Sequence, residues 1–85
     1  MKRKILVAGL GLIGGSLAKA MKKTEENYIL GYDLNKETLK IALDDGTIDE
    51  ICTDFESGVK NAEVVFLAAP ITETIELLKQ LDNIE

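Results

Sequence analysis

The sequence predicts an α/β fold in which helical crossovers join the strands of a parallel sheet. Short, continuously apolar runs recur along the chain, as expected of strands that are buried on both faces. Between these runs, apolar residues repeat at helical spacing, and glycines or polar residues separate the two kinds of segment. With right-handed crossovers, we expect a partial, doubly wound parallel sheet with strand order 3-2-1-4.

The first strand and the first helix are expected between residues 4 and 24. The strand is the run KILVA, residues 4–8, which Gly9 closes. The helical period begins at Ile13 and ends near Thr24, in the polar stretch TEEN. The apolar stripe of this helix consists of Ile13, Leu17, Ala20 and Met21.

The second strand covers residues 28–32 and ends just before Asp33. Asn35 is expected to cap a second helix and Gly46 to terminate it. The stripe of that helix consists of Leu39, Ala42 and Leu43. A short third strand is expected at residues 50–53, EICT.

The last third of the chain repeats the alternation. Asp54 is expected to cap a single helical turn through Val59, and residues 63–68 are the most strand-like segment. Pro70 stands where a following helix accepts proline near its start. The stripe of this last helix consists of Ile71, Ile75, Leu78 and Leu81.

Composition restricts the classes of function. The 85 residues are enough for one small domain, and the net charge of −5 argues against nucleic acid and anionic membranes as partners. The single cysteine, Cys52, excludes an internal disulfide, suits a reducing cytoplasm and is expected to be a small buried hydrophobe. Because the chain has no histidine, we expect neither a zinc site nor the commonest general base.

The start of the chain also has features of a secretory signal peptide, with the basic stretch MKRK, an apolar run and small residues at 18 and 20. The glycines at 9, 11, 14 and 15 weaken a helical signal segment. No other segment is long and apolar enough to span a bilayer. We therefore expect a globular, cytoplasmic protein.

Residues 9–14, GLGLIG, match the pattern G-x-G-x-x-G, which is a weak signal by itself. Here the pattern follows a predicted strand and opens a predicted helix, and Asp33 ends the second strand about 20 residues later. Gly9 allows the tight turn, Gly11 lets a pyrophosphate approach the backbone, and Gly14 lets the helix pack closely on the sheet. The sequence thus predicts a Rossmann-like, dinucleotide-binding fold.

The same features predict the cofactor. The free N–H groups and the dipole of the first helix can hold a diphosphate in an acidic protein. Asp33 would accept hydrogen bonds from the adenosine ribose and repel a 2′-phosphate, which favours NAD over NADP, although Lys36 lies nearby. One alternative is that the glycines form only a tight turn and that Asp33 only caps the next helix. A second open question concerns Ser16, which either donates a hydrogen bond to phosphate or is a small surface residue.

Residues 68–72, AAPIT, leave the fourth strand at its carboxyl end, where ligands bind in open α/β sheets. We expect them to form a wall near the nicotinamide-side ribose, while Pro70 also starts a helix. Glu73, Glu76 and the pair at residues 44–45 are expected on solvated helix faces.

The stretch VAGLGLIGGSLAKAMK, followed by ILGYD and VVFLAAP, resembles the N-terminal part of the prephenate/arogenate dehydrogenase family. The extension Gly15-Ser16-Leu17 makes this resemblance more specific than the glycine pattern alone. The resemblance implies three parts of a cofactor site. Asp33 is the ribose ligand, and the loop that lines the cofactor consists of Ala69, Pro70 and Ile71. The phosphate loop consists of Gly9, Gly11, Leu12, Ile13 and Gly14.

Members of that family oxidatively decarboxylate prephenate or arogenate on the way to tyrosine, with a nicotinamide cofactor. They carry a catalytic histidine and a helical dimerisation domain further along, and residues 1–85 contain neither. The resemblance implies that residues 1–85 are the N-terminal part of a dinucleotide-binding domain of such an oxidoreductase, inactive alone. A non-catalytic NAD-sensing module and another NAD(P)-dependent dehydrogenase of small substrates, such as an imine reductase, are the alternatives. Because the fourth strand lies at a sheet edge, we also expect a homodimer through it.

Overall fold

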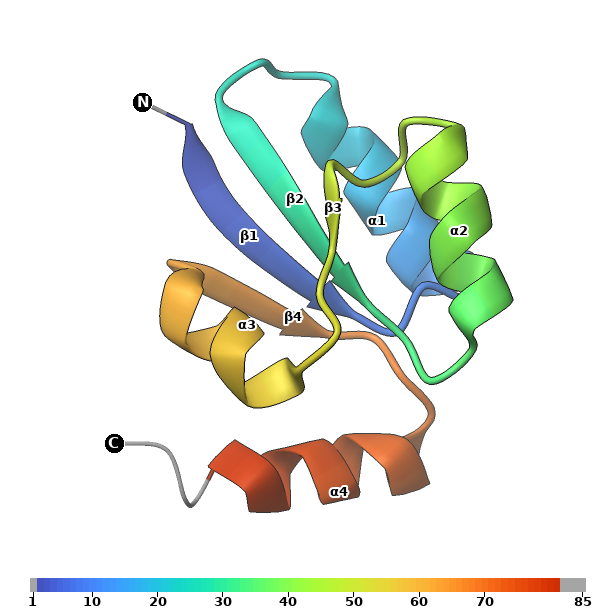
Figure 1. Ribbon diagram of the computed structural model, residues 1–85, viewed down its shortest axis with the longest axis vertical. Helices are drawn as coiled ribbons and strands as arrows, with labels where there is room; N and C mark the ends of the chain where they lie inside the picture. Colours follow the sequence, from blue (N-terminus) through green and yellow to red (C-terminus); the bar gives the residue numbers. More distant parts are fainter. Residues whose placement is uncertain (1, 82–85) are drawn as a thin grey trace.

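The computed structural model describes residues 2–81. These residues form one four-stranded sheet with the order β3-β2-β1-β4, in which every pair of strands is parallel (Figure 1). The fold class and the strand order are therefore confirmed. The elements are β1 (Arg3–Ala8), α1 (Leu12–Lys22), β2 (Asn27–Tyr32), α2 (Lys36–Asp44), β3 (Glu50–Ile51), α3 (Phe55–Asn61), β4 (Val64–Leu67) and α4 (Ile71–Leu81).

The strand β1 lies at the centre of the sheet and is buried on both faces. Ile5 and Val7 point into one core cluster, together with residues of α1 and α2. Leu6 and Ala8 point into the other cluster, together with residues of α3 and α4. Because successive side chains of a strand point to opposite faces, the continuous apolar run of β1 accounts for both layers of helices.

The strand register brings the functional loops to one edge. Ala8, the last residue of β1, is paired with Tyr32 of β2 and with Leu67 of β4. All three strands thus end at the same level. The segments that follow them, which begin at Gly9, Asp33 and Ala68, are neighbours at the carboxyl edge of the sheet.

Several local expectations are confirmed. Asn35 caps α2 through its side chain, and Gly46 follows the end of that helix. Asp54 caps α3, which continues to Asn61 and is longer than the single turn expected. Cys52 is buried, and burial raises the pKa of its thiol. The third strand is shorter than expected, because only Glu50–Ile51 pairs with β2.

The stripe expected for α1 was partly wrong. Ile13 is 76% exposed, whereas Gly14 and Ala18 are the buried residues of the helix. The cause is close packing: a glycine and an alanine face the sheet, and this rotates the larger Ile13 side chain outward. Leu17 and Met21 are half-buried, and Ala20 is exposed.

The stripes expected for α2 and α4 also need correction. In α2, Leu39 and Ala42 are buried, but Leu43 is 39% exposed. In α4, Leu77 is the residue that enters the core, while Ile75 and Leu78 are nearly half exposed. The helix α4 lies next to α3 and makes fewer contacts with the sheet, so part of its apolar stripe stays uncovered (Figure 1). The side chains of residues 71 and 81 lie outside the described part of the structure.

Within residues 2–81, no helix has the length and apolar character that crossing a membrane would require.

Candidate functional site

Gly9 makes the turn between β1 and α1, and two constraints require a glycine there. Its φ angle is +99°, a conformation that residues with side chains rarely adopt. A Cβ atom at Gly9 would also lie 2.6 Å from the backbone nitrogen of Ala69. The loop after β1 and the loop after β4 therefore touch backbone to backbone.

Gly14 completes this close contact from the first turn of α1. A Cβ atom at Gly14 would overlap the carbonyl oxygen of Gly9 and would lie 3.2 Å from the Cβ of Ala68. The tight turn expected at Gly9 and the close packing expected at Gly14 are both present. The sequence interpretation did not foresee that Ala68 must also be small, although a small residue directly after a strand is a usable signal.

Gly11 differs from the other two glycines of the motif. It is the N-cap residue of α1, with φ −71° and ψ −159°, and no heavy atom lies within 4 Å of the position its Cβ would take. Most residues can adopt this extended conformation. The packing of the described residues thus does not require glycine at this position, and the space above it is open.

The first turn of α1 offers backbone donors. Among the described residues, no side chain caps α1, and its first turn contains no acidic residue. The first N–H groups of a helix have no partner inside the helix and carry its positive dipole end. The side chains of Leu12 and Ile13 are exposed around this turn. The hydroxyl of Ser16 donates to the carbonyl oxygen of Leu12 at 2.8 Å, which favours its interpretation as a surface residue.

Asp33 follows β2 and contacts the glycine turn directly. One carboxylate oxygen accepts a hydrogen bond from the backbone N–H of Leu10 at 2.7 Å. The other oxygen accepts from the backbone N–H of Asn35 at 2.9 Å. Since Asn35 caps α2, the alternative in which Asp33 only caps that helix is wrong.

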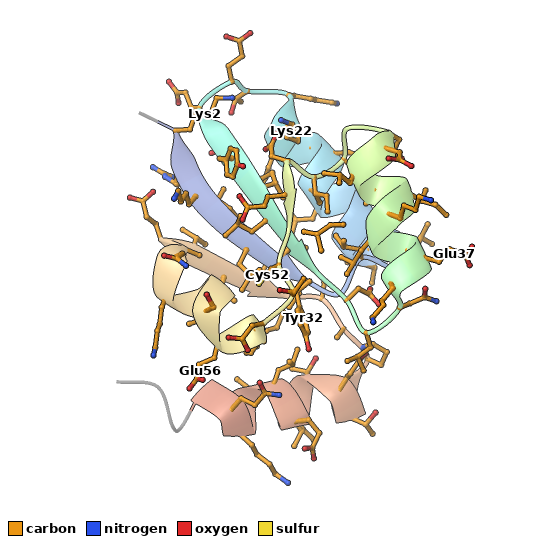
Figure 2. All side chains as sticks on the ribbon, in the orientation of Figure 1. Lys2, Lys22, Tyr32, Glu37, Cys52 and Glu56 are labelled. Carbon is orange, nitrogen blue, oxygen red and sulfur yellow. The ribbon has the colours of Figure 1, made fainter. Side chains whose placement is uncertain are left out.

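A cavity of about 460 Å³ lies beside Asp33 at the ends of β2 and β3. Tyr32, Leu34, Lys36 and Thr53 are among the residues that line it. A larger cavity, of about 780 Å³, lies at the opposite edge of the sheet, among Lys2 and its neighbours. Figure 2 shows Lys2 and Tyr32 at these two separate places. A third cavity, of about 250 Å³, is lined by Leu10, Gly11 and Leu12 among others, and it is the one that adjoins the glycine turn.

The loop after β4 forms the other wall of the site. The backbone N–H of Ala68 donates to the carbonyl oxygen of Ala8, and the hydroxyl of Thr74 donates to the carbonyl oxygen of Ala69 at 2.9 Å. The loop is therefore tied both to β1 and to the first turn of α4. Pro70 is exposed just before α4, as expected of a residue that starts a helix. The side chain of Ile71 lies outside the described residues.

A glycine turn after the first strand, an acidic residue after the second and a close approach of the loops after β1 and β4 define a dinucleotide-binding domain of the Rossmann class. Comparison with known proteins specifies the family. Residues 17–85 match the family model described as "Prephenate dehydrogenase, nucleotide-binding domain". The chain belongs to the prephenate dehydrogenase family.

Curated relatives agree with this assignment. The chain is 46% identical to the prephenate dehydrogenase of Bacillus subtilis (strain 168) over 82 residues, which cover 95% of this chain and 22% of that protein. It is 44% identical to the prephenate dehydrogenase of Lactococcus lactis subsp. cremoris (strain MG1363) over 80 residues. These residues cover 93% of this chain and 22% of that protein. The chain thus spans about a fifth of the length of these relatives.

Solved structures show the same arrangement. One is the prephenate dehydrogenase of Aquifex aeolicus in complex with hydroxyphenyl propionate and NAD+, with a TM-score of 0.84 and 33% identity. The match covers 99% of this chain and 30% of that one. Another is the arogenate dehydrogenase of Synechocystis, with a TM-score of 0.81 and 33% identity. That match covers 92% of this chain and 27% of the Synechocystis chain.

Proposed function

We propose that this chain binds NAD as the nucleotide-binding part of an oxidoreductase that oxidatively decarboxylates prephenate or arogenate. The observation that carries the proposal is the start of α1, where backbone donors are uncapped beside the open space over Gly11. Family membership and the NAD+ in the related Aquifex aeolicus structure support it. Bound NAD would supply the hydride acceptor of the reaction.

Each part of the site has a proposed role. The phosphate loop consists of Gly9, Gly11, Leu12, Ile13 and Gly14, with the diphosphate on the backbone N–H groups at the start of α1. Asp33 accepts hydrogen bonds from the adenosine ribose, and its charge disfavours NADP. The nicotinamide side of the cofactor lies against the loop of Ala69, Pro70 and Ile71. We assign no catalytic group to residues 1–85, which contain no histidine.

The proposal extends to the setting of the protein. Residues 1–85 form the N-terminal part of a dinucleotide-binding domain, and we infer that it works in the cytoplasm. The strand β4 pairs with β1 on one side, and Phe66 on it is 37% exposed. An uncovered apolar edge favours pairing with a second copy. Light scattering after size-exclusion chromatography should find a dimer at high concentration, and a monomer at every concentration would contradict this.

The cofactor assignment is tested by Gly11→Val. The new side chain fills the open space over the loop, so we expect NAD binding to be lost in isothermal titration calorimetry. The unfolding temperature should fall by only about a few degrees, because the described fold leaves that space empty and valine is a poorer helix cap than glycine. The matched control is Gly15→Ala, whose Cβ would lie 3.7 Å from the nearest heavy atom, in ordinary contact. Unchanged NAD affinity in Gly11→Val, or a wild-type chain that prefers NADP, would contradict the assignment.

A further inference from the structure

We propose that Asp33 is also a positioning residue, whose carboxylate holds the backbone of the phosphate loop in place before any nucleotide binds. This inference rests on the dinucleotide site proposed above, but it concerns the chain without ligand. It gives Asp33 a second task besides accepting hydrogen bonds from the ribose.

The hydrogen bonds between β1 and β2 show how the carboxylate acts. The N–H of Gly9 donates to the carbonyl oxygen of Tyr32 at 2.7 Å, as in a regular parallel pair. The next N–H along the chain, that of Leu10, donates at 2.7 Å to the Asp33 side chain. The carboxylate therefore replaces a backbone acceptor and extends the contact between the two strands by one residue into the turn.

The turn needs such a contact because of its composition. Glycines flank Leu10 on both sides, and a glycine loses more conformational freedom on ordering than any other residue. The Leu10 side chain is buried in the core cluster shared with α1 and α2. Packing fixes the position of the Leu10 side chain, and the hydrogen bond to the Asp33 carboxylate fixes its backbone N–H. A hydrogen bond to a charged acceptor is stronger than one to a neutral acceptor.

The two tasks of Asp33 are compatible. A carboxylate has about four acceptor positions, and the N–H groups of Leu10 and Asn35 occupy one on each oxygen. The remaining positions are available to ribose hydroxyls. A loop that already has its bound conformation loses less entropy when the diphosphate arrives. Removing Asp33 should therefore weaken the binding of a diphosphate even where no ribose hydroxyl is present.

Hydrogen exchange on the nucleotide-free chain tests the contact itself. In Asp33→Ala, we expect the Leu10 amide to lose protection by about tenfold or more, while the neighbouring Gly9 amide changes less than about twofold. Asp33→Leu, which has a similar shape but can accept neither bond, carries the same test if Asp33→Ala unfolds. The control is Asn35→Ala, which removes the cap of α2 and leaves the N–H of Asn35 in place. Equal protection of Leu10 in wild type and in the folded variant, Asp33→Ala or Asp33→Leu, would overturn the proposal.

A pair of nucleotides separates positioning from ribose binding. ADP and 2′,3′-dideoxy-ADP share the diphosphate, and only ADP has ribose hydroxyls for Asp33 to bind. If Asp33 positions the loop, Asp33→Ala should weaken the binding of both nucleotides, that of the dideoxy compound by about fivefold to tenfold. If Asp33 is a ribose ligand alone, the affinity for the dideoxy compound stays unchanged, and this overturns the proposal. A wild-type chain that binds neither nucleotide contradicts the proposed function instead, and hydrogen exchange still decides the role of Asp33.

Discussion

The starts of α1 and α2 face the same edge of the sheet but are built in opposite ways. At α2, the side chain of Asn35 accepts hydrogen bonds from the N–H groups of Glu37 at 2.9 Å and Thr38 at 3.1 Å. At α1, the cap residue is Gly11, and within residues 2–81 no side chain accepts from the first turn. One helix start is capped by a side chain, and the other has no side-chain acceptor among the described residues, where we propose that the diphosphate binds.

The comparison shows what allows α1 to begin without a cap. Its inner face packs on the sheet through Gly14 and Ala18. At its far end, Lys22 forms an ion pair with Asp49 at 2.5 Å, and Asp49 also accepts from the backbone N–H of Ile29 at 2.7 Å. Figure 2 shows Lys22 at the end of the helix away from the glycine turn. The packing of α1 on the sheet and the ion pair at its far end therefore stabilise the helix without a side-chain cap at its first turn.

The largest expected effect on stability is that of Gly14→Ala, which attacks the packing of α1. The new methyl group overlaps the carbonyl oxygen of Gly9, and backbone cannot move aside cheaply. We expect a loss of about 3 kcal/mol or more in the free energy of unfolding, measured by urea denaturation.

Gly15→Ala is the matched control on the next residue of the same helix. Its methyl group has room, so it should stabilise the chain by about 0.5–1 kcal/mol through helix propensity. Equal effects of the two substitutions would show that α1 does not pack as closely as the structure indicates.

The sequence predicted the close contact at Gly14 but not the orientation of the helices around it. The places of the strands and the caps at Asn35 and Asp54 depend on local patterns, and these predictions were correct except for the length of the third strand. The exposure of Ile13 and of Ile75 depends on how a helix is rotated on the sheet. That rotation is set by contacts between distant segments, such as Gly14 with Ala68, which periodicity along one helix does not contain.

The contact between Asp33 and Leu10 could not be predicted for a related reason. The sequence indicates an acidic residue at the end of β2, and that residue type suits a ribose. Whether its carboxylate also binds a backbone N–H 23 residues earlier depends on the register of β1 and β2. The register follows from the folded sheet, in which Ala8 and Tyr32 end side by side.

The next effect in size concerns the far end of α1 and depends on pH. Burial would raise the pKa of Asp49, but hydrogen bonds from Lys22 and Ile29 outweigh it and hold the pKa below the ordinary 3.8. A carboxylate with a lowered pKa stabilises the fold above its ordinary pKa, and this contribution disappears as the pH falls through the lower, folded-state value.

We therefore expect Asp49→Asn to reduce the free energy of unfolding by about 1–2 kcal/mol at neutral pH. The difference from wild type should shrink as the pH falls below 3.8 through the lowered folded-state pKa of Asp49, because the wild-type carboxyl group then becomes protonated as well. Urea denaturation at a series of pH values measures both quantities. A difference that stays constant throughout this acid range would mean that the charge of Asp49 contributes nothing.

A smaller effect is expected from Asn35→Ala at the start of α2. Two backbone N–H groups lose their acceptor, which corresponds to about 1 kcal/mol and a decrease of about 4–8 °C in the unfolding temperature. The affinity for NAD should change little, because the contact between Asp33 and the N–H of residue 35 is retained. Calorimetric unfolding and titration with NAD measure the two results. A loss of NAD binding without a loss of stability would show that the start of α2, and not only that of α1, takes part in binding.

The smallest effect on stability, and the sharpest test of the comparison, is that of Gly11→Asp. This substitution gives α1 the kind of cap that α2 already has, at a residue whose backbone is extended as a cap requires. Since glycine is itself a tolerable cap, the free energy of unfolding should rise by only a few tenths of a kcal/mol. The new carboxylate would occupy the first-turn N–H groups and repel a diphosphate, so NAD binding should be lost while the fold becomes slightly more stable. A variant that binds NAD as well as wild type would show that the open start of α1 does not hold the diphosphate.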